Sequence, residues 1–378
     1  MISPRAFYET LAAEGVNFVV GVPDSLLKEL CTYIDAAVLG ERHVISANEG
    51  TAVGLAAGHH LAKGGIPLIY LQNSGLGNMV NPLLSLADAE VYSLPMIAIV
   101  GWRGEPGHKD EPQHVKQGRV TPAMLDAMEI PYRVLNGDQN DATDAAIWAC
   151  RTARIINAPV MLLVQKGAFG KAEEKRPVCY VPEKSITRES AIELIISNLP
   201  ASTMVVATTG MISRELYELR GALGQDRSSD FLTVGSMGHA SQIALGIARA
   251  KPETQVVCLD GDGAALMHLG GMATIGTSVI GNLLHIVLNN GAHDSVGGQP
   301  TVAQKISLTA IARACGYDVV AGPSEHKREI VTQIKHLAQI SGRRFLEVRV
   351  RPGSRSDLGR PQEDPIENKL QFIGRLRS

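Results

Sequence analysis

The sequence repeats one structural plan at a constant offset, and this repeat restricts the fold more than any other feature. Short apolar runs end at Leu71 and at Leu259, 188 positions apart. The same offset moves the apolar run 97–100 onto 285–288, which is again a strand pattern. An offset that joins several elements predicts two domains of one fold.

Each copy alternates short apolar strands with helical segments, some of them rich in Ala and Gly. Continuous apolar runs of this length are typical of parallel strands buried on both faces. We therefore expect an α/β protein with two similar domains, each a mostly parallel sheet with helices on both faces. The expected strands are 18–20, 67–71, 97–100, 204–207, 255–259 and 285–288, and the expected helices are 5–14, 51–62, 188–198, 240–250 and 266–275, with others from Ser25 and Ser213.

We place the domains at 1–175 and 186–378. The stretch 176–185 is predicted to be a linker, because the sequence around it is rich in Lys, Glu, Pro and Gly. Ligands of open parallel sheets bind at the carboxyl ends of the strands. The functional loops are therefore expected to follow Val20, Leu71, Val100, Ala207, Leu259 and Leu288.

Composition excludes several classes of protein. A net charge of −2 argues against a nucleic-acid-binding protein, which would carry a basic surplus. No apolar run approaches ~18 residues, so we expect no membrane span. The five cysteines are scattered and form no Cys-x-x-Cys pair, which predicts neither a zinc site nor a disulfide framework. We expect a cytoplasmic protein with reduced thiols.

Polar residues follow two successive strands of the second domain. Asp262 lies in Asp260-Gly261-Asp262-Gly263, and Asn290 follows the next strand, 28 positions later. A carboxylate, an amide oxygen and a nearby backbone carbonyl suit Mg²⁺. Glycines here would let the backbone approach phosphate groups. Gly-Asp-Gly alone would indicate only a strand-to-helix turn, but the Asn pair at this spacing favours the metal site.

This pattern resembles the signature of thiamin-diphosphate enzymes, in which a pyrimidine-binding and a diphosphate-binding domain share one fold. The resemblance covers essentially the whole chain and makes 1–175 the pyrimidine-binding domain and 186–378 the diphosphate- and Mg-binding domain. It implies thiamin diphosphate and Mg²⁺ as cofactors. The implied metal ligands are Asp262, Asn290 and the Ala292 carbonyl, and the implied neighbours of the diphosphate are Gly261, Gly263, Ala264, Thr209, Gly210 and Met211.

The resemblance also assigns two residues that are again 188 positions apart. Glu49, before a small-residue helix, is the implied catalytic acid that hydrogen-bonds N1′ of the aminopyrimidine. Met237 is the apolar residue over which the cofactor bends, and the Gly235 carbonyl would receive the 4′-amino group. The alternative for Glu49 is a glutamate favoured by the helix dipole, and for Met237 it is core packing.

A two-domain chain of this size resembles the phosphonopyruvate and sulfopyruvate decarboxylases. The similar segments are 21–25, 101–107, 110–114, 289–299 and 353–361. The resemblance implies non-oxidative decarboxylation of 3-phosphonopyruvate to phosphonoacetaldehyde and CO₂ in phosphonate biosynthesis. Two alternatives remain open: sulfopyruvate decarboxylation, and a thiamin-diphosphate-binding protein without catalysis.

The loop after Val100 is rich in cations, which suits a small anionic 2-oxo acid. A solvated charged loop is the alternative. His114 or His293 is the expected proton donor to the product. The expected substrate-binding residues are Asp24, Ser25, Arg103, His108, Lys109 and Gln113. Arg355 and Arg360 form either a lid or a basic tail.

The assembly expected from the resemblance is a homodimer or a higher homo-oligomer, with each site formed between chains. The helical segments 49–62 and 237–250 show little of the polar stripe expected of a solvent-facing helix.

Overall fold

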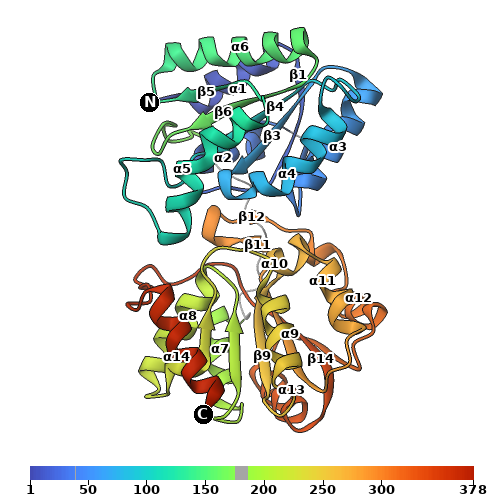
Figure 1. Ribbon diagram of the computed structural model, residues 1–378, viewed down its shortest axis with the longest axis vertical. Coiled ribbons are helices and arrows are strands. Elements are labelled where there is room, and N and C mark those ends of the chain that lie inside the picture. The colour runs from blue at the N-terminus through green and yellow to red at the C-terminus, as the bar shows by residue number, and fades with distance from the viewer. Residues whose placement is uncertain (39, 175–185) are drawn as a thin grey trace. The chain divides into compact units, whose positions relative to one another are not determined.

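The computed structural model describes residues 1–38, 40–174 and 186–378. The chain separates into two compact units, Met1–Cys179 and Tyr180–Ser378, each with its own six-stranded sheet (Figure 1). The predicted linker 176–185 lies outside the described residues. Within the described ranges, no helix is both long and apolar enough to cross a membrane.

The first unit contains an all-parallel sheet with the strand order β2-β1-β3-β4-β6-β5. Its strands are β1 (Val16–Gly21), β2 (His43–Ile45), β3 (Ile66–Gln72), β4 (Met96–Gly101), β5 (Tyr132–Leu135) and β6 (Pro159–Val164). Its helices are α1 (Pro4–Ala13), α2 (Lys28–Ala37), α3 (Glu49–Lys63), α4 (Leu76–Pro82), α5 (Pro112–Ala127) and α6 (Gln139–Ile156).

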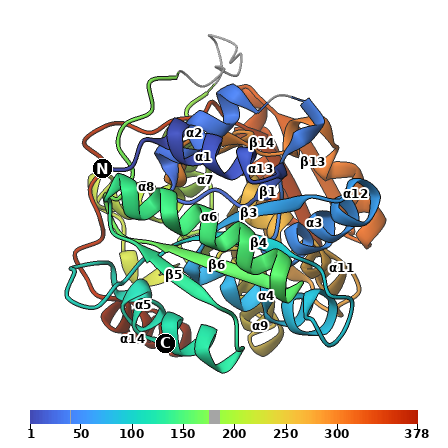
Figure 2. The same ribbon diagram turned by 90° about the horizontal axis from the view of Figure 1, so that it is seen from above.

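Helices cover both faces of this sheet, because successive side chains of a strand point to opposite faces. Leu68 and Tyr70 of β3 belong to the core formed with α1, α2 and α6. Ile69 and Leu71 of the same strand belong to the core formed with α3, α4 and α5. Figure 2 shows α1, α2 and α6 close to one another over one face.

The second unit contains an all-parallel sheet with the strand order β13-β14-β10-β9-β7-β8. Its strands are β7 (Met204–Ala207), β8 (Asp230–Leu232), β9 (Val256–Gly261), β10 (Asn282–Asn289), β13 (Val319–Ser324) and β14 (Gly342–Arg349), and a small antiparallel pair joins β11 (Ala292–His293) to β12 (Gln299–Pro300). Its helices are α7 (Arg188–Ser197), α8 (Met211–Ala222), α9 (Ala240–Ala250), α10 (Asp262–Met267), α11 (Gly270–Gly276), α12 (Leu308–Cys315), α13 (Lys327–Gln339) and α14 (Pro365–Arg377).

The two sheets have the same topology. Counted along the chain within each main sheet, both have the order second, first, third, fourth, sixth, fifth. The strands that the constant offset related, β3 with β9 and β4 with β10, hold equivalent places. The predicted fold class is therefore confirmed.

Each unit also pairs its own beginning with a segment near its end. Ile2 forms a parallel bridge with Phe169, and Gly170 N donates to Ile2 O at 2.8 Å. In the second unit, Thr187 forms a parallel bridge with Arg351, whose N–H donates to Ile186 O at 2.9 Å. The segment that precedes the first helix of each unit thus pairs with the segment that follows its last strand.

Most predicted helices differ from the observed ones by one or two residues at an end, and two differ more. The helix expected from Ser25 begins at Lys28, because Asp24 first accepts the N–H groups of Leu26 and Leu27 and turns the chain. The helix expected over 266–275 is two short helices, α10 and α11. His268, with φ −126° and ψ 53°, leaves the helical region and ends α10.

Candidate active site

Glu49 is the first residue of α3 and is buried, with 5% of its surface exposed. The helix begins here because Asn48 Oδ1 accepts the Gly50 N–H at 2.8 Å. Glu49 does not point into solvent, as a glutamate at a helix N-terminus usually does. Its Oε2 accepts a hydrogen bond from Asn78 Nδ2 at 2.7 Å.

The space for the Glu49 carboxyl comes from a glycine. A Cβ atom at Gly75, in the turn after β3, would lie 2.1 Å from Glu49 Oε1. Any larger residue there would therefore displace the carboxyl. Burial raises the pKa of Glu49, and the Asn78 hydrogen bond opposes that rise. The result is a buried carboxyl that can share a proton with a ligand nitrogen.

Asp24, in the turn after β1, is fully buried. Its Oδ2 accepts the N–H groups of Leu26 at 3.0 Å and Leu27 at 3.3 Å. Its Oδ1 has no hydrogen-bond partner among the described residues. Burial raises the pKa of Asp24 to about 6, although the Arg103 guanidinium lowers it. A ligand donor would satisfy the unpaired oxygen.

Arg103 lies in the loop after β4 and is fixed rather than free in solvent. Its Nε and Nη2 donate to the two carboxylate oxygens of Asp110 at 2.8 and 2.5 Å, and its Nη1 donates to Ser25 Oγ at 3.0 Å. A guanidinium has five N–H groups, so two remain for an anion. The structure thus brings Asp24, Ser25 and Arg103 together, with Asp110 as a competing partner that was not predicted for Arg103.

The other predicted residues of this loop differ in exposure. The His108 side chain is 59% exposed, 3.6 Å from Glu105, and Lys109 is also exposed. Gln113 is half-buried, whereas His114 is buried. Burial lowers the pKa of His114 to about 4, so this imidazole is neutral at pH 7. Its Nδ1 has no partner in the described part of the chain.

In the second unit, Asp262 and Asn290 lie at the carboxyl ends of the neighbouring strands β9 and β10. The Asn290 backbone N–H donates to the Asp262 carboxylate, as does the hydroxyl of Thr301. Burial raises the pKa of Asp262 to about 6, against these hydrogen bonds. Asn290 Oδ1 accepts the Ala292 N–H at 3.0 Å, so the third predicted ligand belongs to the same turn.

Met237, Gly263 and His293 also lie together. A Cβ atom at Gly263 would lie 3.0 Å from His293 Cε1 and 3.3 Å from Met237 Cε. The segment before Met237 is held by Gly235 N, which donates to Thr209 Oγ1 at 3.0 Å. Burial lowers the pKa of His293 to about 4.

The remaining predicted residues flank this edge of the sheet. Gly210, with φ +97°, precedes α8, and a Cβ atom there would lie 3.7 Å from Ser295 Cβ. Met211 is the first residue of α8, and Arg214 Nη1 lies 3.7 Å from its sulfur. Gly261 ends β9, and Ala264 is buried in α10.

The residues present fit a divalent cation. Asp262 is a buried carboxylate whose pKa is set by burial and by hydroxyl and backbone N–H donors, and Asn290, one of those backbone donors, also carries an amide oxygen. Hard oxygen ligands of this kind suit Mg²⁺. The buried Glu49 carboxyl likewise fits a ring nitrogen.

The partners of these residues were not predicted from the sequence. Asn78 orients Glu49, and Thr301 orients Asp262; both partners are distant in the sequence from the residue they orient. Asp110 orients Arg103 and lies only seven positions after it. A different buried cluster, Cys258, Asp260 and His285, also brings potential metal-ligating atoms together. There, however, His285 already contacts Asp260 at 3.3 Å and Tyr317 at 3.0 Å.

Comparison with known proteins decides the family. Phosphonopyruvate decarboxylase of Streptomyces viridochromogenes is 37% identical, over 98% of this chain and 94% of its own length. The chain belongs to the thiamine-pyrophosphate-dependent decarboxylases. Residues 4–130 match the N-terminal TPP binding domain of thiamine pyrophosphate enzymes, and residues 209–348 match the C-terminal TPP binding domain.

Sulfopyruvate decarboxylases are also similar to this chain. A sulfopyruvate decarboxylase of Methanosarcina acetivorans is 29% identical, over 92% of this chain and 90% of its own length. Sulfopyruvate decarboxylase subunit beta of Methanothermobacter thermautotrophicus is 36% identical, over 51% of this chain and 96% of its own length. Membership in this family establishes thiamin diphosphate as the cofactor, with Mg²⁺ as the usual partner metal.

Proposed function

We propose that this protein decarboxylates 3-phosphonopyruvate to phosphonoacetaldehyde and CO₂, as a step of phosphonate biosynthesis. The observation that supports this most directly is the 37% identity to phosphonopyruvate decarboxylase over nearly the whole chain. Sulfopyruvate is the alternative substrate, because a sulfonate offers similar anionic oxygens and the named relative is 29% identical. Glu49, Asp262 and Asn290 are all present, which argues against a protein that binds the cofactor without catalysis.

Bound thiamin diphosphate would supply the nucleophilic carbon and accept the electrons left by CO₂. Glu49 would share a proton with the N1′ nitrogen of the pyrimidine. Asn78 occupies Glu49 Oε2, which leaves Oε1 for that contact. Gly75 keeps the space around Oε1 open.

Asp262, Asn290 and the Ala292 carbonyl would hold Mg²⁺, and the cation would bind the diphosphate. Met237, beside Gly263, would support the bent cofactor, and the Gly235 carbonyl would accept the 4′-amino group. The contacts to the diphosphate would come from Thr209, Gly210, Met211, Gly261, Gly263 and Ala264.

The anionic group of the substrate would be bound by the loop after β4. Arg103 offers its two remaining N–H groups, and Ser25 and Asp24 lie beside it. Gln113, His108 and Lys109 complete the proposed set. His114 and His293 are neutral at pH 7, so either would donate the proton as a neutral imidazole and not as an imidazolium.

A steady-state comparison of three 2-oxo acids tests the substrate. We expect kcat/KM for phosphonopyruvate to exceed that for sulfopyruvate and to exceed that for pyruvate far more, because pyruvate lacks the second anionic group. A preference for sulfopyruvate would select the alternative. Equal values for phosphonopyruvate and pyruvate would contradict an anion-binding loop.

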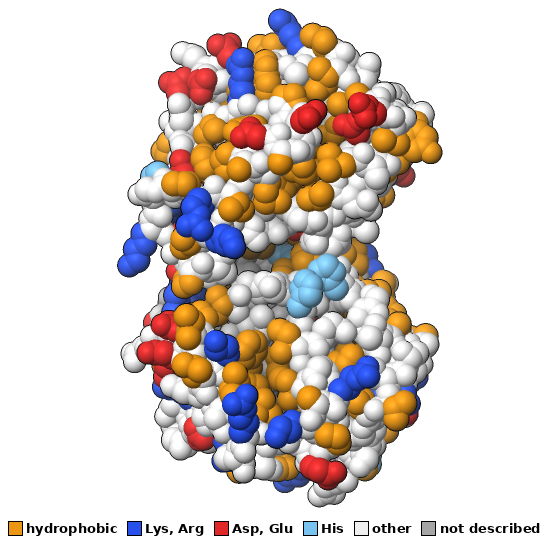
Figure 3. Space-filling view, viewed as in Figure 1, with side chains coloured by type: hydrophobic (Ala, Val, Ile, Leu, Met, Phe, Trp, Pro, Cys, Tyr) orange, Lys and Arg blue, Asp and Glu red, His pale blue; other side chains and the backbone are white. Residues whose placement is uncertain are grey.

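We also propose that the protein works as a homodimer or a higher homo-oligomer, with each site shared between chains. The exposed side of α3 carries apolar or small residues without charge until Lys63, and Leu61 is 73% exposed. Hydrophobic side chains are abundant on the face of this unit drawn in Figure 3. An apolar helix side of this kind supports contact with a second copy. The exposed residues of α3 before Lys63 are Thr51, Gly54, Leu55, Gly58, Leu61 and Ala62.

Complementation tests this assembly. Inactive Glu49→Gln and Asp262→Ala chains, unfolded and refolded together, are expected to regain activity. A mixed dimer would contain one site with both substitutions and one site with neither. Folded, associated but inactive mixtures would show that each site lies within a single chain.

We propose a cytoplasmic location. The four cysteines in the described ranges carry thiols and form no disulfide, which is usual for a reducing compartment.

A further inference from the structure

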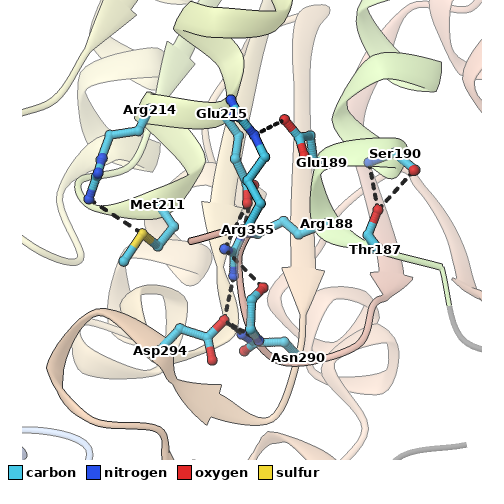
Figure 4. A network of polar contacts seen from close by, with 11 residues as sticks. Thr187, Arg188, Glu189, Ser190, Met211, Arg214, Glu215, Asn290, Asp294 and Arg355 are labelled. Carbon is cyan, nitrogen blue, oxygen red and sulfur yellow. Dashed lines mark hydrogen bonds and ion pairs between the residues drawn. The ribbon is translucent and has the colours of Figure 1, made fainter. Parts of the chain in front are cut away.

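A buried arginine lies at the start of the second unit. Arg188, the first residue of α7, is 4% exposed. Its Nε and Nη2 donate to the two carboxylate oxygens of Glu215, in α8, at 2.8 and 2.9 Å (Figure 4). A buried guanidinium is stable only when its N–H groups have partners. Because Glu215 binds Nε and Nη2, the third nitrogen of the guanidinium, Nη1, needs another hydrogen-bond partner.

That partner is Asp294, in the turn after β11. Arg188 Nη1 donates to Asp294 Oδ2 at 2.6 Å. The same oxygen accepts Asn290 Nδ2 at 2.7 Å and Gly353 N at 3.0 Å. One carboxylate oxygen therefore joins a buried cation, a residue of the proposed metal site and the C-terminal segment, as Figure 4 shows for the side chains.

The hydrogen bond to Asn290 has a defined chemical consequence. A carboxamide has an oxygen that can bind a cation and a nitrogen that cannot. Because Nδ2 donates to Asp294, Oδ1 must point the other way. Oδ1 accepts the Ala292 N–H, and a carbonyl oxygen has a second lone pair for another partner.

We propose that Arg188 and Asp294 are positioning residues, which hold the Asn290 carboxamide with its oxygen toward the metal. This inference rests on the metal site proposed above. Arg188 acts through Asp294: its charge compensates the carboxylate that accepts the Asn290 hydrogen bond, and its pair with Glu215 fixes it in place. Residues behind metal ligands commonly change metal affinity by ~10–100-fold when they are replaced.

The unit contains a matched control. Arg220 is also buried, at 9% exposed, and donates from Nε and Nη2 to the two oxygens of Asp230, both at 2.9 Å. Asp230 begins β8, at the opposite strand end from the loops that carry Asp262 and Asn290. Arg188→Met and Arg220→Met thus both remove a buried two-point ion pair, but only the first touches the Asn290 network.

Calorimetric titration of each full-length variant with thiamin diphosphate, at a series of Mg²⁺ concentrations, tests the proposal. Arg188→Met is expected to raise the Mg²⁺ concentration needed for half-maximal cofactor binding by ~10–100-fold. Arg220→Met is expected to change it by less than ~3-fold, although both variants lower the melting temperature. Arg188→Lys, which keeps the charge, should recover part of the lost metal affinity.

Equal Mg²⁺ requirements in Arg188→Met and Arg220→Met would overturn the proposal and make Arg188 a purely structural residue. If Arg188→Met does not fold, Asp294→Asn is compared with Asp230→Asn, with the same expected difference. Asp262→Ala separates this failure from failure of the metal site itself. Unchanged cofactor binding in Asp262→Ala would place the metal elsewhere, whatever Arg188 does.

Discussion

The two units build one sheet topology and then hold a buried carboxylate at its carboxyl edge in different ways. Glu49 in the first unit has one side-chain donor, Asn78, besides its own backbone N–H, and a neighbouring glycine that leaves space. Asp262 in the second unit accepts a hydroxyl and backbone N–H groups. Burial raises the pKa of both.

The difference teaches that the partners of a buried carboxylate indicate which ligand it suits. A carboxyl with a single side-chain donor and open space suits a proton shared with a ring nitrogen. A carboxylate fixed by several donors, beside an amide oxygen, suits a cation. Two domains of one fold can therefore carry different chemistry when the residues at their strand ends differ.

The largest expected effect tests the role of Asp262, the buried carboxylate of the second unit. Asp262→Ala removes the proposed cation ligand, so thiamin diphosphate affinity should fall by ~10²-fold or more, as several kcal/mol of charge compensation are lost. Calorimetric titration in saturating Mg²⁺ measures the affinity. Wild-type affinity would show that this carboxylate does not hold the metal.

Glu49→Gln tests the role of the buried carboxyl of the first unit. The substitution preserves shape but weakens the proton-sharing contact, so turnover should fall by at least ~10²-fold, with near-normal cofactor affinity. Exchange of the cofactor's C2 proton, followed by NMR, should slow in parallel. If affinity fell and exchange did not, the two carboxylates would act alike and the comparison would be wrong.

Arg103→Ala sharpens the comparison by testing whether the first unit also binds the substrate. Losing a charge-assisted hydrogen bond should lower kcat/KM for phosphonopyruvate by ~10–100-fold, and that for pyruvate much less. Asp110→Asn is the companion variant, because it frees the guanidinium from its bidentate partner. Equal losses for both substrates in Arg103→Ala would indicate a structural role.

The smallest expected effect concerns stability. Burial raises the pKa of Asp24 to about 6 from 3.8, so the folded state favours the protonated carboxyl. Its contribution to stability is present below pH ~4 and is lost as the pH rises through 6. Relative to Asp24→Asn, the wild-type free energy of unfolding should fall by about 1–3 kcal/mol between pH 4 and 7. Urea denaturation at four pH values measures this, and parallel curves would contradict it.

The sequence predicted the fold well, because apolar periodicity and the constant offset are properties of the chain itself. Strand β7 and helix α9 begin and end where expected. The interruption at His268 and the delayed start at Lys28 were missed, since a side-chain contact or a local turn sets each.

The site residues followed from motif spacing and resemblance, and their roles remain proposals. Their partners could not be predicted. Thr301 lies 39 positions after Asp262, and Arg188 lies 106 positions before Asp294. Only tertiary folding brings such pairs together. Arg355 shows the same problem: it contacts Glu189, Glu218 and Asp357, so its guanidinium anchors the C-terminal segment to α7 and α8.

In each unit, the first segment pairs with a segment that follows the last strand, so the two units could be encoded by separate genes. Ile2 closes the first unit against Phe169, and Thr187 closes the second against Arg351. A break in the chain between Glu174 and Ile186 would therefore remove neither closing bridge. Two separately translated polypeptides should therefore each keep the bridge that closes their own fold. With this architecture, the two units can be encoded by one gene or by two genes, and each keeps its own fold.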